Sequence, residues 1–372
     1  MTATRTTHAP PPPALVDALK AAHVPVESFE EACRACGDCD DDADVEDYPK
    51  GFDVDLDSTM LGEMKAFGRQ ILVSTGKSDW PHNVCEDSKD IPGLVEAAYG
   101  EAEKSGDKSG RPGLLSKLSS KLLGGGKGDA GPPGVHPSSA ALPPDTAPSS
   151  KLTILASSFI SSSHEGHKES VIVLPDFKVV ENVAPTKEDA NELVQRYLVP
   201  EAGRAGTAEA GTLKSWPLPY HAVVLLCSHK KRDKRCHISA PLLISQFHHH
   251  LEKHGFHVDE RGDDLADGPS IEEWADTVEE RELRLKETLQ GVKKDDGRVG
   301  LFKVSHLGGH KFAGNVIIFF PSGSCVWYGR ATPKDVGIIV DRTILGGKVI
   351  PELLRGGLGL AGKDGEKGVL EW

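Results

Sequence analysis

The sequence predicts an α/β protein with two domains. Its 372 residues are long for a single domain and sufficient for two. Short apolar runs typical of buried strands alternate with amphipathic segments typical of helices along most of the chain. A stretch rich in Gly, Ser, Pro, Ala and Lys at 105–150 interrupts this alternation and predicts a flexible insertion.

The overall composition limits the classes of function. A net charge of −13 argues against general nucleic-acid binding, and no run of apolar residues is long enough to cross a membrane. The N-terminal segment lacks the apolar stretch of a secretory signal, and seven cysteines without such a signal fit a reducing compartment. We expect a cytoplasmic protein, with the nucleus as the alternative, that binds neither nucleic acid nor membranes.

The first domain is predicted at 25–200, after a Pro-rich N-terminus at 1–24 that we expect to be disordered apart from a short helix after residue 12. Thr186 is a typical helix N-cap, placed directly before a helical pattern. The predicted elements are a strand that runs into a loop within 68–81, a helix at 91–104, strands at 151–159 and 169–183, and a helix at 186–198. They form one α/β domain that the insertion interrupts.

The second domain is predicted at 215–345, followed by a Gly-rich tail at 346–372. Its elements are a buried strand at 221–227, a helix at 239–255, a short strand at 256–260, a charged helix within 270–294, a strand at 298–306, two strands within 315–332, and a closing helix at 332–344. With the charged helix taken as an insertion, the order β-α-β…β-β-α is that of a thioredoxin-like sheet.

Two pairs of metal-binding residue types occur in the second domain. Cys227 ends a strand and Cys236 follows nine residues later, while His306 ends another strand and His310 follows four residues later. We place both pairs where a strand gives way to a loop, which is the usual position of a site on a rigid scaffold. Two thiolates and two imidazoles fit either tetrahedral zinc or a [2Fe-2S] cluster with mixed ligands, and the spacing does not choose between them.

The glycines between the two histidines favour a loop. Gly308 and Gly309 are adjacent, and each weakens a helix interior by about 1 kcal/mol relative to Ala. Glycines also allow the backbone to approach a cluster closely. Cys227 and His229 have the C-x-H spacing of a Rieske centre, but the second half of that pattern is missing because Cys236 and a histidine are directly adjacent.

Several motifs make the second domain resemble the thioredoxin-like [2Fe-2S] ferredoxins. In those proteins a spaced Cys pair follows one strand and a C-x3-C pair follows a later one; here H-x3-H replaces the second pair. The segments "HLGGHKFAGN" (306–315), "STGKSDWP" (74–81) and "VWYGRATPKDVGIIV" (326–340) are similar to the sucrase/ferredoxin-like family. This resemblance covers 70–345 apart from the insertions.

The resemblance implies that Cys227, Cys236, His306 and His310 are the ligands of a [2Fe-2S] cluster in an electron-transfer protein. Neutral imidazoles in place of two thiolates raise the reduction potential, and a ligating imidazole keeps one N–H that can titrate. We therefore hypothesise that electron transfer is coupled to proton transfer. The alternatives are a zinc-stabilised interaction module with the same four ligands and a scaffold without metal.

The remaining functional indications are weaker. The name of the family implies glycosidase chemistry, which requires a facing pair of carboxylates, and the sequence identifies none, so enzymatic activity stays open. The segment 228–235 is strongly basic. It could offset the charge of a cluster or dock an acidic redox partner, and the alternative is an ordinary solvated loop. No flavin or nicotinamide site is recognisable.

A second cysteine group lies near the N-terminus. Its C-x2-C-x2-C spacing overlaps part of a bacterial ferredoxin motif, but the neighbours are acidic and the rest of the motif is absent. The candidates for a second metal or redox site, with free thiols as the alternative, are Cys33, Cys36, Cys39 and Cys85.

The C-terminal residues Leu370, Glu371 and Trp372 resemble the tripeptide by which cytosolic iron–sulfur assembly machinery recognises some apo-proteins. A terminal aromatic with its carboxylate is a suitable ligand for a pocket. The alternative is a frayed end.

Overall fold

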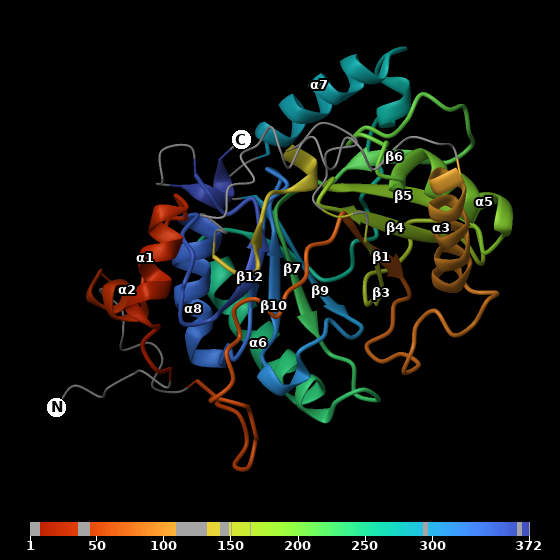
Figure 1. The fold of residues 1–372 in the computed structure, drawn as a ribbon. Coiled ribbons are helices and arrows are strands. Elements are labelled where there is room, and N and C mark those ends of the chain that lie inside the picture. Colours follow the sequence, from red (N-terminus) through yellow and green to blue (C-terminus); the bar gives the residue numbers. More distant parts are fainter. Residues whose placement is uncertain are drawn as a thin grey trace.

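The structure is a computed structural model that describes residues 8–35, 45–108, 132–141, 149, 151–163, 165–292, 297–362 and 367–371. A mixed sheet of twelve strands runs through the molecule (Figure 1). Eleven strands follow the order β2-β12-β11-β10-β7-β9-β3-β1-β4-β5-β6, and β8 pairs with β9. The predicted α/β class is confirmed as a mixed sheet with helices.

The N-terminal half of the sheet is built around a parallel pair. β1 and β3 are parallel, and α3 lies between them in the sequence; β4 is antiparallel to β1, and β5 and β6 extend the sheet on that side. The elements are β1 (Arg69–Ser74), α3 (Ile91–Lys108), β3 (Leu152–Ser157), β4 (Glu169–Leu174), β5 (Lys178–Val183), α5 (Lys187–Leu193), the π-helical segment η2 (Val194–Leu198) and β6 (Lys214–Pro217). The predicted cap is confirmed, since the Asp189 N–H donates to the Thr186 hydroxyl at 3.1 Å.

The C-terminal half repeats this arrangement. β7 and β9 are parallel, α6 lies between them in the sequence, β10 is antiparallel to β7, and β11 is antiparallel to β10. The elements are β7 (Tyr220–Cys227), α6 (Lys234–Lys253), β8 (His257–Asp259), β9 (Arg298–Val304), β10 (Val316–Phe319), β11 (Cys325–Tyr328), and a helical segment formed by η5 (Pro333–Asp335), α8 (Val336–Ile338) and η6 (Ile339–Leu345). In each half a helical segment that ends in a π-helix follows an antiparallel strand. It follows β5 in the N-terminal half and β11 in the C-terminal half.

The two halves meet where the inner strands of each end. β3 and β9 are antiparallel, and Ser157 pairs with Val304. Within the halves, Ser74 pairs with Ser157 and Cys227 pairs with Val304. The topology therefore relates the halves by an approximate two-fold rotation, in which Ser74 and Cys227 occupy equivalent positions.

The hydrophobic core is divided by the sheet. Ile71 and Val73 face α3 and α5 in one cluster, while the side chains of Val224 and Leu226 belong to another with α6 and α8. The opposite face of the sheet carries a third cluster to which both halves contribute, and Leu289 of α7 (Val278–Gln290) packs there. Burying each large aliphatic side chain contributes about 1.5–3 kcal/mol, so this shared cluster links the stability of the halves.

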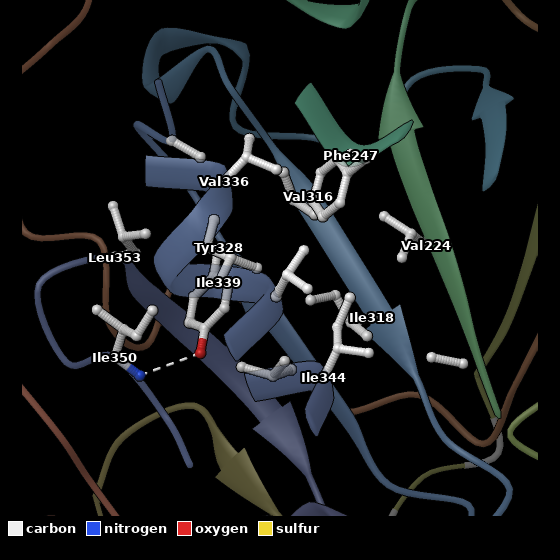
Figure 2. Close-up of a cluster of buried hydrophobic side chains, with 14 of the residues drawn as sticks. Val224, Phe247, Val316, Ile318, Tyr328, Val336, Ile339, Ile344, Ile350 and Leu353 are labelled. Atoms are coloured by element: carbon white, nitrogen blue, oxygen red, sulfur yellow. Dashed lines mark hydrogen bonds between the residues drawn. The ribbon is translucent and has the colours of Figure 1, made fainter. Parts of the chain in front are cut away.

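Figure 2 shows the cluster beneath the C-terminal helical segment. Val224, Phe247 and Ile339 are fully buried there. Tyr328 places its hydroxyl inside the cluster, where the Ile350 N–H donates to it at 3.0 Å and Thr343 is a second hydrogen-bond partner at 2.7 Å. This buried hydroxyl is therefore satisfied, as burial of a polar group requires.

Several segments differ from the sequence-based expectation. Residues 169–183 form a hairpin of two strands, and the Gly-rich region after 346 contributes β12 (Leu354–Leu358) to the sheet. The predicted insertion lies largely outside the described residues; its described part includes β2 (Val135–His136), which pairs with β12, and the short turn η1 (Ser139–Ala141). One sheet runs through both predicted domains, so the division at about residue 200 stays a prediction.

The remaining short elements lie near the termini and in the connections. They are α1 (Pro13–Ala21), α2 (Phe29–Ala35), η3 (Ile271–Glu273), η4 (His310–Phe312) and η7 (Gly368–Leu370). Among the described residues, no helix is both long and apolar enough to span a bilayer.

Candidate metal centre

The two cysteines of the candidate site come together at the end of β7. Cys227 is the last residue of that strand, and Cys236 lies in the first turn of α6; the two side chains are 3% and 1% exposed. We expected Cys236 in a loop, but α6 begins at Lys234 because the Asp233 carboxylate accepts the Arg235 N–H at 2.9 Å and caps the helix. The early start of the helix turns Cys236 back toward Cys227.

The protonation of this pair is uneven. The pKa of the Cys227 thiol lies well below its ordinary value because Cys236 donates a hydrogen bond to it, assisted by His306 and the Leu307 N–H, against the opposing effect of burial. The pKa of Cys236 is raised because its thiol is held by Cys227 and is buried. The contact therefore favours a thiolate at Cys227, which is the form that binds metals.

The two histidines come from the end of the neighbouring strand. His306 lies two residues after β9, and His310 begins η4; their ring centroids are 5.4 Å apart and the rings are tilted by 43°. In the part of the chain that the structure describes, the Nδ1 atoms of both rings are buried and have no hydrogen-bond partner. Each ring thus holds a nitrogen that is suited to a ligand and is otherwise unsatisfied.

The predicted loop between the histidines is confirmed. Gly308 and Gly309 have φ values of +82° and +63°, a left-handed region that costs other residues about 1–3 kcal/mol each. A Cβ atom at Gly309 would also overlap the guanidinium group of Arg355, whereas one at Gly308 would meet nothing within 4 Å. The glycines therefore allow a tight turn that lies against Arg355.

Arg355 is a site residue that sequence analysis missed. It lies on β12 and is 3% exposed. Its Nη1 donates to Asn315 Oδ1 at 2.6 Å and to the Gly308 carbonyl at 3.3 Å, and the Asn315 amide donates to the Gly309 carbonyl at 3.1 Å. The only sequence signal was a lone arginine in the Gly-rich region after 346, and nothing connected it to the histidines.

The N-terminal half also contributes to the surroundings of the site. His229 Nε2 lies 2.9 Å from the Trp80 carbonyl oxygen, and the two rings meet edge to face. The Ser228 hydroxyl donates to the Ser78 carbonyl at 3.0 Å, and the Trp80 indole donates to the Thr75 hydroxyl at 2.9 Å. The segment "STGKSDWP" after β1 therefore packs on the loop after β7, and brings His229 beside the candidate ligands.

The four candidate ligands form two pairs. Among the described residues, no three His, Cys, Asp or Glu side chains lie close enough together to hold one metal ion. One thiol pair and one imidazole pair fit a [2Fe-2S] cluster, in which each of two irons takes two protein ligands. The unsatisfied Nδ1 atoms and the buried thiols support that fit.

A cavity of about 660 Å³ is lined by residues of the N-terminal half and of α7, and by none of the four candidate ligands. Arg69 and Glu282 are among its lining residues. The Arg69 guanidinium is already held by the Asp176 carboxylate at 2.9 Å and by the Ala202 carbonyl at 2.6 Å. This arginine is therefore committed to structure rather than available to a bound anion.

The second cysteine group is only partly described. Cys33 lies on α2 and packs against the core cluster of the C-terminal half. Cys85 lies in the loop after β1, where burial and the neighbouring Glu96 raise its pKa to about 12. Cys36 and Cys39 lie outside the described residues, so a second metal site stays a prediction.

The C-terminal tripeptide follows a docked segment. Val369 is fully buried and its carbonyl accepts the Ser322 hydroxyl at 2.7 Å, and Leu370 packs against the same core. Glu371 is half-buried, and Trp372 lies outside the described residues. The recognition of this end by assembly machinery stays a prediction.

Comparison with known proteins identifies the family. The family model described as sucrase/ferredoxin-like matches residues 60–356, most of the chain. The chain belongs to the sucrase/ferredoxin-like family. The matched residues of this family include the four candidate ligands and Arg355.

Two relatives illustrate the range of similarity. "Altered inheritance of mitochondria protein 32" of Debaryomyces hansenii is 29% identical over 222 residues, which cover 55% of this chain and 65% of the relative, somewhat less than two thirds of its length. "Actin patches distal protein 1" of Saccharomyces cerevisiae is 25% identical over 325 residues, which cover 85% of this chain and 81% of the relative. No solved structure matches the chain.

Proposed function

We propose that this protein transfers electrons through a [2Fe-2S] cluster held by Cys227, Cys236, His306 and His310. The observation that carries the proposal is the meeting of a buried thiol pair and an imidazole pair with unsatisfied Nδ1 atoms at the ends of two adjacent parallel strands. When bound, such a cluster takes up and releases one electron at a time.

The chain's own residues orient and shield this site. Because β7 and β9 are parallel neighbours, Cys227 and the segment that begins with Ser305 emerge at one edge of the sheet. The Leu307 N–H supports the Cys227 thiolate, and burial of both cysteines excludes water from the sulfur atoms. The half-buried histidines remain closer to solvent, which suits the exchange of a proton with each electron.

The fold supports a thioredoxin-like assignment for residues 215–345. With β8 and α7 taken as additions to the connection, the strand order β9-β7-β10-β11, a parallel pair joined through α6 with two antiparallel strands beyond it, is the order expected of that fold. The closing helical segment follows in the expected place.

The partner that we propose is an acidic redox protein. Four basic side chains in the segment between the two cysteines are exposed, and the nearby Asp79 and Asp233 offset only part of their charge: Lys230, Lys231, Arg232 and Lys234. A basic patch on a chain of net charge −13 steers an acidic partner toward the site. We also propose a cytoplasmic location and cluster delivery by assembly machinery that recognises Leu370, Glu371 and Trp372.

The test is the visible absorption spectrum of the freshly purified full-length chain, together with its content of iron, acid-labile sulfide and zinc. We expect red-brown protein with two irons and two sulfides per chain, as the [2Fe-2S] formula requires. Cys227→Ala should abolish the colour, whereas Cys325→Ala, a control at another buried thiol, should retain it. Colourless protein with stoichiometric zinc would establish the structural module instead, and protein without metal would reject both.

A further inference from the structure

We propose that Arg355 is a positioning residue of the cluster site, which holds the loop between the two histidines in place and supplies a fixed positive charge beside the two thiols. The charge part of this inference rests on the proposed [2Fe-2S] function, whereas the loop part concerns the chain without metal. The two parts can therefore be tested separately.

The hydrogen bonds of Arg355 converge on the turn between the histidines. Its guanidinium binds the Gly308 carbonyl directly and reaches the Gly309 carbonyl through the side chain of Asn315. Asn315 itself precedes β10, the strand beside β7, and its carbonyl accepts the Cys227 N–H at 3.5 Å. Arg355 thus connects the histidine loop to the backbone that carries the first cysteine.

Packing fixes the plane of the guanidinium group. Its central carbon lies 5.5 Å from the ring centre of Phe312 and 5.6 Å from that of Trp327. A flat, delocalised cation stacks on aromatic rings and keeps its donors in a rigid fork, which a lysine ammonium does not do. The loop packs closely on the same guanidinium group, because a Cβ atom at Gly309 would overlap it.

Arg355 is a buried cation close to groups that can carry negative charge. Glu63 and the thiols of Cys227 and Cys236 are near enough to act on the charge of its guanidinium group. Glu63 is already 3.5 Å from the ammonium group of Lys311. Burial lowers the pKa of Arg355 to about 10, so the guanidinium remains a cation at neutral pH.

This fixed charge affects the two oxidation states differently. Reduction adds one negative charge to the site, and a nearby buried cation stabilises the reduced form more than the oxidised form. The same cation favours the thiolates that hold the metal. Loss of the charge should therefore lower the midpoint potential and weaken metal retention.

The decisive variant is Arg355→Met in the full-length holoprotein, which removes the charge and hydrogen bonds but keeps an unbranched apolar stem. We expect the reduction equilibrium to become about tenfold less favourable, a fall of about 59 mV for one electron. Arg355→Lys should retain most of the potential but lose cluster faster than wild type, because charge remains without the fork.

Arg330→Met is the matched control. Arg330 also lies against Phe312, at 5.1 Å from its centre, but donates to the carbonyls of Asp55 at 2.6 Å and Ser58 at 2.8 Å. Its replacement should leave the midpoint potential within the error of the wild-type value. An equal fall in the Arg330 and Arg355 variants would overturn the specific role of Arg355, as would an unchanged potential in Arg355→Met.

Hydrogen–deuterium exchange of the apo-protein tests the loop part without a cluster. Amides of residues 305–314 should exchange faster in Arg355→Met than in wild type and Arg330→Met, while the peptide from β4 stays unchanged. Unchanged exchange in 305–314 would refute the positioning role. If wild-type protein binds no iron, the proposed function fails, yet this exchange result still decides whether Arg355 holds the loop.

Discussion

The two halves of the sheet share one topology but differ at the ends of their parallel strands. In the C-terminal half, β7 ends in Cys227 and β9 is followed by His306. In the N-terminal half, the equivalent strand β1 ends in Ser74, whose hydroxyl donates to the Glu169 carboxylate, and β3 ends in Ser157. Equivalent backbone positions thus carry candidate metal ligands in one half and a hydroxyl–carboxylate network in the other.

The comparison shows that the two halves share a backbone arrangement but differ in the residues that could bind a metal. The alternation of strands and helices is the same on both sides, so it does not by itself specify a site. What differs is the residues at the ends of the strands and just beyond them, where the C-terminal half holds thiols, imidazoles and the two glycines of the turn. The N-terminal half instead supplies Trp80 and Ser78, which pack against the opposite loop.

The largest expected difference concerns the equivalent residues Cys227 and Ser74. Cys227→Ser should abolish visible absorption and iron binding, because a hydroxyl is a poor substitute for a thiolate ligand. Ser74→Ala should retain full iron content but lower the free energy of unfolding by about 1–3 kcal/mol, since the half-buried Glu169 loses a hydrogen-bond partner. Metal analysis and urea unfolding measure the two effects. Loss of iron in Ser74→Ala would contradict a purely structural role for Ser74.

Replacing both histidines by cysteines tests what the imidazoles add. Wild-type holoprotein should show a midpoint potential that falls with pH by up to about 59 mV per unit, for one proton per electron. The double variant His306→Cys with His310→Cys should have a lower potential that does not depend on pH, because thiolate ligands carry more negative charge and no N–H. Redox titration from pH 6 to 10 provides the measurement, and a flat wild-type profile would reject proton coupling.

The adjacent glycines provide an internal comparison within the turn. Gly308→Ala should lower the free energy of unfolding by about 1–3 kcal/mol through the left-handed backbone alone. Gly309→Ala should be more destabilising and should also reduce cluster retention, because its Cβ atom overlaps Arg355. Urea unfolding and iron content test the order; equal effects at the two positions would argue against the close fit.

The smallest expected effect concerns the loop of the N-terminal half that packs against His229. Trp80→Phe keeps an aromatic ring against His229 but removes the indole donor to Thr75. We expect a loss of about 0.5–1.5 kcal/mol in the free energy of unfolding, typical of one hydrogen bond, with an unchanged spectrum. A changed spectrum would show that the N-terminal half affects the site more directly.

Local sequence patterns account for much of the fold. Apolar runs located β1, β3, β7, β9, β10 and β11, and a Thr cap located α5, because buried strands and capped helices have short-range signatures. The start of α6 was missed because its first residues continue the basic segment 228–235, which resembles a solvated loop in the sequence. β12 was missed because Gly356 and Gly357 weaken the strand pattern, although both lie against neighbouring backbone.

The candidate site was predictable only in part. The four candidate ligands have recognisable residue types and spacing, and the glycines indicated the loop. Arg355 is 45 residues beyond His310 in the sequence and meets the loop only through the pairing of β12 with β11. Such a contact depends on long-range strand pairing, which has no local signature.

The antiparallel contact between β3 and β9 has a practical consequence for dissecting the molecule. A fragment that begins after residue 215 would leave β9 with an unpaired end and would uncover the apolar face that the halves share. Exposed strand edges beside apolar surface promote self-association. We therefore expect the C-terminal half to aggregate when expressed alone, and the proposed redox chemistry to require the half that carries none of the four candidate cluster ligands.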